Sequence, residues 1–251
     1  MARILILLPQ NDFDPTEVAV PWSCWTKAGI EVAFATENGM MASCDIVTLT
    51  GNGLPGYARS LAARPDVRQL YAAMSGSAAF RKPMSWTSVN ISAFSAVHFP
   101  GGHAPGMKTY LESGEVQRIA RRAFDANTPV SAICHGVVAL ARTRRPDGNS
   151  ILFGRKTTAL TQRMERISIA LTRRKLGFHY RTYPQTVESE VRAALAIAKD
   201  FKSGPFIPRF ATERHPDRGF VVEDGQYLSA RWPGDAWTLA TRMRDLLLHS
   251  T

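Results

Sequence analysis

A cysteine and a histidine stand side by side at positions 134 and 135, where one apolar segment ends and another begins. Residues 130–133 have the length and composition of a short buried strand, and residues 137–140 resemble the start of an apolar helix. Cys134 is therefore predicted on a sharp strand-to-helix connection. Such a turn lifts a nucleophile clear of the sheet, and the helix N-terminus favours a thiolate over a thiol.

The backbone N–H group next to a nucleophile on such a turn can also bind an oxyanion. Ala132 and Gly136 are small enough to permit the tight turn. The pattern is thus typical of a catalytic thiol at Cys134. The alternative is a buried cysteine that acts as a small hydrophobic residue, which is the usual environment of a free cysteine.

Strands and helices alternate along the chain around this turn. Apolar runs of strand length are found at residues 3–8, 30–35, 95–100 and 130–133. Between the first two, Asp14 can cap a helix, Pro15 suits its first position and Gly29 suits its end. The alternation predicts an α/β fold with a doubly wound, mostly parallel sheet sandwiched by helices.

The segment from about residue 43 to 87 breaks this alternation. It holds "TGNGLPG", a helical pattern over 57–74 and the linker-like "SGSAAFRKP". We expect a single domain over residues 1–251 with a small cap-type insertion at about 43–87. Near the C-terminus, "FVVEDGQYLSAR" predicts a hairpin and residues 236–247 predict a closing helix.

The composition excludes several classes of partner. The net charge is +10, but the basic residues fall in short clusters without interleaved aromatic residues or a nucleic-acid-binding motif. Solvent-exposed helix faces explain them, so no nucleic acid partner is expected. Three cysteines at unrelated spacings form neither a disulfide framework nor a thiolate cage. With no secretory signal or membrane-spanning segment in the pattern, we expect a cytoplasmic protein and no membrane partner.

Several motifs together resemble one known family. "AICHG", with "FPGGH" upstream and "DFDPTEVAVPW" after the first strand, closely resembles the DJ-1/PfpI superfamily (class I glutamine amidotransferase-like). The Cys-His-Gly turn is similar to its Hsp31-like and PfpI-like branches. "GRKTTALTQRMER" and "YLSARWPGDA" extend the resemblance over nearly the whole chain. The resemblance implies a flavodoxin-like fold and a homodimer.

The same resemblance implies roles for single residues. Cys134 corresponds to the nucleophile and His135 to its neighbouring base. Glu17 corresponds to a protonated carboxyl group that donates a hydrogen bond to the thiolate and lowers the thiol pKa. Glu17 also fits a helix-capping box that begins at Asp14, so its helical position alone has a simpler explanation.

Gly101 and Gly102 resemble the glycines of the family's oxyanion loop, in which the N–H of Gly102 pairs with that of His135. A glycine-rich loop after a strand can also cradle phosphate, but this one lacks the spacing and the lysine of a P-loop. His103, in the same loop, is expected to line the mouth of the pocket. Its alternative is an ordinary loop histidine.

The acid that orients the histidine in the family is best matched by Glu165, although a surface glutamate at a helix start is the simpler reading. His98, within a predicted strand, is expected to be a packed core residue. No metal site and no cofactor are expected.

The resemblance implies a cysteine-dependent, glutathione-independent glyoxalase of the glyoxalase III type. Such an enzyme converts a small-molecule carbonyl substrate, a 2-oxoaldehyde such as methylglyoxal, into a 2-hydroxy acid. An amidase or peptidase would use the same nucleophile on an acyl carbon. A third possibility is a stress-responsive holdase chaperone or redox sensor, whose function would depend on exposed apolar surface or on oxidation of Cys134.

Overall fold

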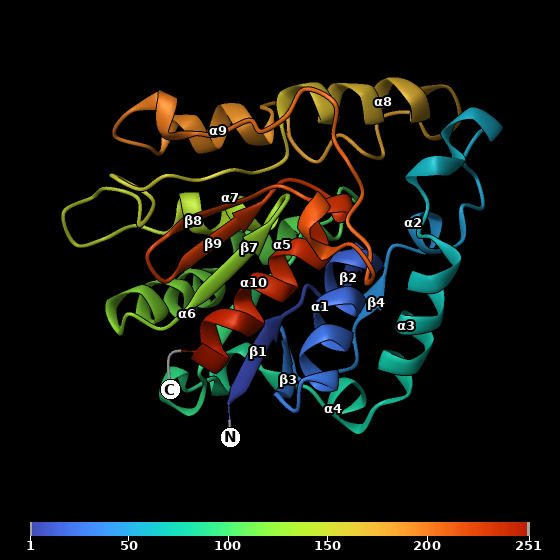
Figure 1. Cartoon of the computed structure of the whole chain (residues 1–251). Helices are drawn as coiled ribbons and strands as arrows, with labels where there is room; N and C mark the ends of the chain where they lie inside the picture. The colour runs from blue at the N-terminus through green and yellow to red at the C-terminus, as the bar shows by residue number, and fades with distance from the viewer. Residues whose placement is uncertain (1, 250–251) are drawn as a thin grey trace.

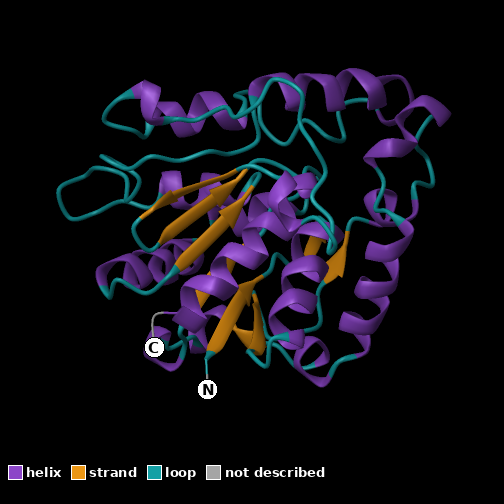
Figure 2. Ribbon diagram, viewed as in Figure 1, coloured by secondary structure: helices purple, strands orange, loops and turns teal. Residues whose placement is uncertain are grey.

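The computed structural model describes residues 2–249, which form a seven-stranded sheet between two layers of helices (Figures 1 and 2). The strands lie in the order β5-β3-β1-β6-β7-β9-β8, and every neighbouring pair is parallel except β8 and β9. Their bounds are β1 (Arg3–Leu7), β3 (Glu31–Thr36), β5 (Met84–Ser85), β6 (Ala96–Phe99), β7 (Val130–Ile133), β8 (Val221–Asp224) and β9 (Tyr227–Ala230). The order β3-β1-β6-β7-β9 is the flavodoxin-like 2-1-3-4-5 order, so the predicted fold class is confirmed.

The central strands are buried on both faces, as their continuous apolar runs predict. All residues of β6 and β7 are buried, and so are four of the five residues of β1. The four strands predicted near residues 3–8, 30–35, 95–100 and 130–133 are present and parallel. The predicted hairpin is the antiparallel pair β8–β9, which turns at Gly225 with a φ of +61°.

Helices cover both faces of the sheet (Figure 1). On one face α1 (Pro15–Lys27) packs against α10 (Ala236–His249), and α3 (Pro65–Gly76) packs on α1. The other face carries α5 (Met107–Glu112), α6 (Gly114–Asp125) and α7 (Gly136–Arg142). As predicted, Asp14 caps α1, and it does so by accepting hydrogen bonds from the N–H groups of Thr16 and Glu17.

Two further helices, α8 (Gln162–Leu176) and α9 (Val187–Ala193), lie across the end of the sheet toward which β1 points (Figure 1). None of the helices within residues 2–249 combines the length and the hydropathy that a bilayer crossing requires.

The segment at 43–87 contributes to two parts of the molecule. It begins with β4 (Ser43–Cys44), which pairs with β2 (Asn11–Phe13), and continues through α2 (Ile46–Thr50) and a 3₁₀ helix (Gly56–Leu61). It then forms α3, α4 (Ala78–Arg81) and β5, the edge strand beside β3. Its second half therefore belongs to the framework of the main sheet, and the boundaries of a cap remain a prediction.

The single helix predicted over 57–74 is wrong in its first half. Pro65 occupies the first position of α3 and Arg64 before it is extended. A proline lacks the N–H group that a helix interior needs, and it restricts the preceding residue to an extended conformation. A helix running through Arg64 and Pro65 is therefore broken at that point.

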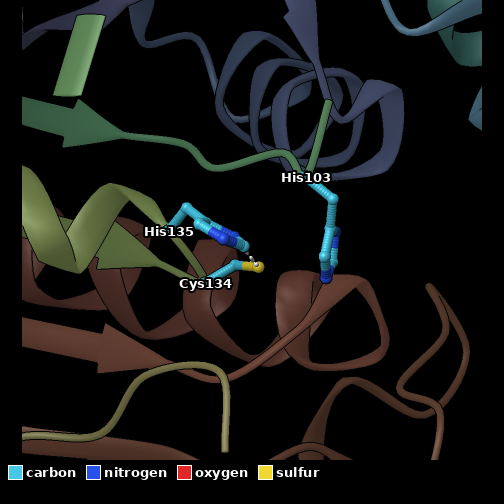
Figure 3. A group of neighbouring side chains, drawn as sticks. All are labelled: His103, Cys134 and His135. Atoms are coloured by element: carbon cyan, nitrogen blue, oxygen red, sulfur yellow. Dashed lines mark hydrogen bonds between the residues drawn. The ribbon is translucent and has the colours of Figure 1, made fainter. Parts of the chain in front are cut away.

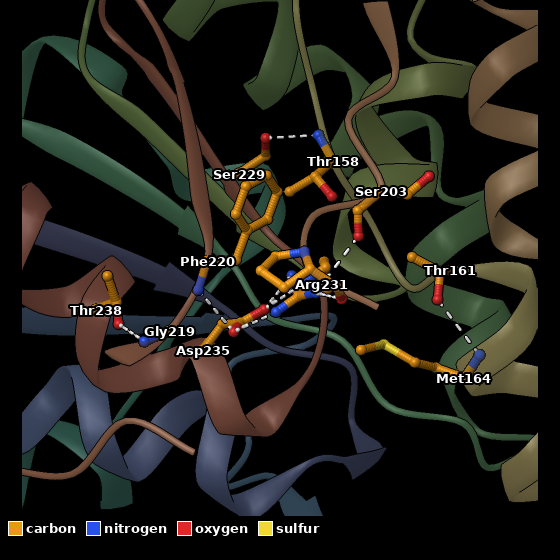
Figure 4. Close-up of polar contacts among 11 residues, drawn as sticks. Thr158, Thr161, Met164, Ser203, Gly219, Phe220, Ser229, Arg231, Asp235 and Thr238 are labelled. Atoms are coloured by element: carbon orange, nitrogen blue, oxygen red, sulfur yellow. Dashed lines mark hydrogen bonds and ion pairs between the residues drawn. The ribbon is translucent and has the colours of Figure 1, made fainter. Parts of the chain in front are cut away.

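A buried ion pair lies in the segment that follows β9 (Figure 4). The carboxylate of Asp235 accepts hydrogen bonds from the Arg231 side chain at 2.9 and 3.1 Å, and both side chains are almost fully buried. Asp235 also accepts the N–H of Phe220, while Arg231 donates to the carbonyl groups of Ser203 and Pro205. One pair thus fixes three separate segments of the chain.

Replacing Asp235 by Ala leaves the Arg231 guanidinium buried without its partner. We expect a loss of about 3–5 kcal/mol in the free energy of unfolding, measured by denaturant titration. The matched control is Glu213→Ala, which removes the exposed ion pair with Lys27 and should cost at most about 1 kcal/mol. Equal losses in the two variants would contradict a structural role for the buried pair.

Candidate active site

Cys134 lies on the sharp turn between β7 and α7, as the sequence predicts. Its φ is +58°, a left-handed conformation that is unusual for a residue with a side chain. The N–H of Cys134 donates to the carbonyl oxygen of Ala230 on β9. A side chain at Gly136 would clash with the carbonyl group of Phe99, so the turn needs glycine there. The sulfur is held at the carboxyl end of the sheet.

Glu17 and the loop after β6 meet Cys134 at this point. A methyl group placed on Gly101 would lie 2.6 Å from the N atom of His135 and 2.9 Å from both Cys134 Cβ and Glu17 Oε2. Gly101 is therefore the point of closest approach between the turn, α1 and the loop. The structure thus brings Cys134, Glu17 and Gly101 together at the carboxyl ends of the strands.

Glu17 is fixed by two interactions with its neighbours. Its Oε2 accepts the N–H of Gly101 at 2.8 Å, and its carbonyl oxygen lies 2.9 Å from Nε2 of His98. His98 is fully buried and also bonds Ser131, as expected of a core residue. Burial, with the nearby charge of Asp14, raises the pKa of Glu17 well above its usual range. This shift favours the protonated carboxyl group, which interacts with the side chain of Cys134.

The structure contradicts the expected low pKa of the Cys134 thiol. The side chain is completely buried, and this burial raises its pKa well above the ordinary value. The N–H of His135 at the helix N-terminus acts in the opposite direction but is the smaller effect. At rest the sulfur carries its proton, so a reaction at Cys134 needs a base.

His135 is placed to be that base. Its Nδ1 lies 3.5 Å from Cys134 Sγ, and its Nε2 lies 3.2 Å from Thr182 Oγ1. The single hydroxyl proton of Thr182 is donated to the carbonyl oxygen of His103 at 2.6 Å. The oxygen of Thr182 can therefore only accept from His135, which puts the ring proton on Nε2. The lone pair on Nδ1 then faces the thiol.

Glu165 does not occupy the orienting position predicted for it. This carboxylate lies on α8 and accepts the N–H of Val187 at the start of α9 at 2.9 Å, and burial raises its pKa to about 7. Among the described residues, the side-chain hydrogen bonds of His135 are made to Cys134 and Thr182. Thr182 lies in a loop without a recognisable motif, so sequence reasoning missed it.

The glycine loop differs in one respect from the expected oxyanion loop. The N–H of Gly101 is engaged by Glu17, so it is not available to a substrate. The N–H of His135 points to the sulfur of Cys134, and no acceptor for the N–H of Gly102 is found among residues 2–249. A side chain at Gly102 would meet the Asp12 carbonyl oxygen at 2.5 Å, which explains the need for glycine.

His103 connects the turn to a cavity of about 110 Å³. Its ring packs edge-on against His135, with centroids 4.8 Å apart (Figure 3). It also packs edge-on against Tyr180. Of His103, Cys134 and His135, only His103 lines the cavity, as the sequence predicts for it. Its Nε2 is buried without a partner in the described part of the chain, and burial lowers its pKa to about 4.

The cavity walls come from segments far apart in the sequence. They are mainly apolar and aromatic, and include Leu54, Leu160, Met164, Phe210, Trp232 and Trp237. The first half of the 43–87 segment supplies one wall. Tyr180 secures this wall through a 2.8 Å hydrogen bond to Asp45, which caps α2.

The motifs and the topology agree with a match to a family described as ThiJ/PfpI family-like, which covers residues 8–205. The chain belongs to this family. The resemblance to the DJ-1/PfpI superfamily is thereby confirmed.

Relatives of this ThiJ/PfpI-like chain include a glutathione-independent glyoxalase of Schizosaccharomyces pombe, hsp3101, which is 27% identical over 146 residues. That match covers 57% of this chain and 56% of the yeast protein, and an uncharacterized protein of the same yeast is 32% identical over 44% of this chain and 41% of its own length. The chain thus spans about half the length of the curated relatives it matches.

Solved structures share the fold over nearly the whole chain. The Rapid Encystment Protein of Francisella tularensis has a TM-score of 0.72 at 19% identity and covers 98% of this chain and 99% of its own. Glyoxalase III of Candida albicans has a TM-score of 0.68 at 19% identity, and the match covers 96% of this chain and 95% of the Candida protein. At this identity the likeness establishes the fold.

The raised pKa of Cys134 predicts a particular pH dependence of its alkylation. The thiolate forms only as the pH rises, so labelling by iodoacetamide should be slow at pH 7 and still increase above pH 9.0, the ordinary thiol pKa. Peptide mass mapping distinguishes Cys134 from Cys24 and Cys44, with Cys134→Ser as the blank. A plateau of Cys134 labelling below pH 7 would show that the thiolate is the resting form.

Thr182 is predicted to set the tautomer of His135. In the wild type, nitrogen NMR of labelled histidine should show the proton on Nε2. Thr182→Val preserves the side-chain shape but removes the acceptor, so this preference should be lost, whereas Thr182→Ser should keep it. A wild-type His135 with its proton on Nδ1 would contradict the assignment.

Proposed function

We propose that the protein is a glutathione-independent glyoxalase that converts 2-oxoaldehydes such as methylglyoxal into 2-hydroxy acids. The observation that carries the proposal is the Nδ1 lone pair of His135 beside the protonated thiol of Cys134, next to a small cavity. The names of the yeast relative and of the Candida albicans structure support it.

In the first step the sulfur of Cys134 adds to the aldehyde carbon. Because the thiol pKa is raised, Nδ1 of His135 takes the Sγ proton as the carbon–sulfur bond forms. The aldehyde oxygen becomes an alkoxide and, once protonated, the hydroxyl group of a hemithioacetal. The N–H groups of His135 and Gly102 are the proposed donors to this oxygen.

In the second step His135 moves a proton from the former aldehyde carbon to the neighbouring ketone carbon. The hydroxyl proton on the former aldehyde carbon passes to the ketone oxygen in the same rearrangement. The aldehyde carbon is thereby oxidised to a thioester and the ketone is reduced to an alcohol, so no external oxidant or reductant is needed. Burial lowers the pKa of His135 well below its usual range, which makes the transient imidazolium a strong proton donor. Water then cleaves the thioester, releasing the hydroxy acid and restoring the thiol.

The cavity also bears on the choice between candidate substrates. A volume of about 110 Å³ with mainly apolar walls admits a small aldehyde, whereas a peptidase needs an open groove for an extended chain. The amidase alternative uses the same nucleophile. It differs from the glyoxalase after the addition step, because only the glyoxalase needs His135 to move a proton between neighbouring carbons.

His135→Ala should lower turnover of methylglyoxal by about a hundred- to ten-thousand-fold, since it removes the proton shuttle. The assay is formation of lactate without glutathione, and mass spectrometry should show that the adduct on Cys134 also forms more slowly, because the thiol has lost its base. Cys134→Ser should abolish both turnover and adduct. The matched control is Glu165→Gln, which keeps an acceptor for Val187 and should retain near wild-type turnover.

Full turnover by His135→Ala would exclude this mechanism. A wild-type protein that does not convert methylglyoxal but hydrolyses amides would favour the acyl-transfer alternative. Inactivity toward both, with suppression of aggregation that survives Cys134→Ser, would favour a chaperone.

A further inference from the structure

Three side chains of residue types that can ligate a metal ion converge at the turn after β7. His103 comes from the loop after β6, and Cys134 and His135 come from the turn itself. Their ligand atoms all lie within 4.8 Å of one another. Figure 3 shows the sulfur of Cys134 directed into the space between the two imidazole rings. The three residues are called the Cys-His-His cluster below.

The hydrogen bonds leave one imidazole nitrogen of each histidine in the cluster available to bind a cation. Because Thr182 accepts the Nε2 proton of His135, the Nδ1 lone pair of this ring points toward the sulfur. Nε2 of His103 is buried and has no partner in the described chain. A buried polar atom without a partner costs free energy, and a bound ligand would remove that cost.

We propose that the Cys-His-His cluster binds one thiophilic divalent cation, with Zn²⁺ as the best match. One thiolate and two imidazoles are preferred ligands of Zn²⁺, whereas Mg²⁺ and Ca²⁺ require oxygen ligands. Three protein ligands leave the fourth tetrahedral position for water or a small molecule, as in open zinc sites. Since His103 borders the cavity, that position is reached from the cavity.

The cluster needs a small adjustment to close around an ion. Zn–N and Zn–S bonds of about 2.0–2.3 Å place tetrahedral ligand atoms roughly 3.3–3.8 Å apart. The largest separation in the cluster is therefore about 1 Å too long. Cys134 and His135 are fixed by the turn, so the movement falls to His103, which lies in a loop and faces the cavity.

Binding would occupy the thiol and its base together. The cation would replace the Sγ proton of Cys134 and coordinate Nδ1 of His135, so neither group could react with an electrophile. The site would thus hold Cys134 in a protected, inactive form until the metal leaves. The metal site does not depend on which reaction the thiol performs.

The test measures binding of Zn²⁺ alone to the chelator-treated, full-length protein by titration calorimetry. We expect one ion per chain. Cys134→Ser and His103→Ala should each weaken binding by at least about 10- to 100-fold, the range already seen when residues that support a ligand are lost. The matched controls are Cys24→Ser and His179→Ala, which change the same residue types outside the cluster and should bind like wild type.

Co²⁺ provides a spectroscopic signature for the same site. A thiolate-to-cobalt charge-transfer band should appear in the wild type and disappear in Cys134→Ser. Zn²⁺ should also protect Cys134 from iodoacetamide. Unchanged Zn²⁺ affinity in a folded Cys134→Ser or His103→Ala variant, verified by circular dichroism, would overturn the proposal, as would less than one ion per chain. Methylglyoxal turnover by the metal-free protein is measured separately, so failure of either proposal is recognised independently.

Discussion

The backbone of Cys134 leaves β7 in a left-handed conformation, and the packing around the turn keeps it there. Such a conformation costs on the order of 1–3 kcal/mol, so it persists only where neighbouring groups determine it. The N–H bond to Ala230 fixes the strand side, and the contact between Gly136 and Phe99 fixes the helix side. Gly101 then allows α1 and the loop after β6 to approach the same sulfur. The geometry of the site depends on this one turn.

Burial around the turn determines the charge state of the site. It raises the pKa of Glu17 and of the Cys134 thiol and lowers the pKa of His135, so burial favours the neutral form of each group. A site that begins without charge must create charge during the reaction, which is why a proton acceptor next to the sulfur is needed. Thr182 meets this need by holding the proton of His135 on the far nitrogen.

The loops at the carboxyl ends of the strands turn this neutral site into a pocket. Trp232 in the cavity wall directly follows Arg231, whose buried ion pair with Asp235 holds three segments together. Elsewhere in the cavity wall, Tyr180 bonds Asp45 at the start of α2. Both supports are polar contacts between residues outside the central sheet, and they fix walls that are otherwise apolar.

The sequence by itself determined the features that depend on local chain chemistry. Apolar runs of strand length predicted the parallel sheet, Asp14 predicted the start of α1, and the small residues around Cys134 predicted the turn. These signals lie within a few residues of the structure they produce. Only the tertiary structure decided that Thr182 rather than Glu165 orients His135, and that the pKa of Cys134 is raised rather than lowered. Both depend on groups brought together from distant parts of the chain, through a hydrogen bond across 47 residues and the exclusion of water by the folded core.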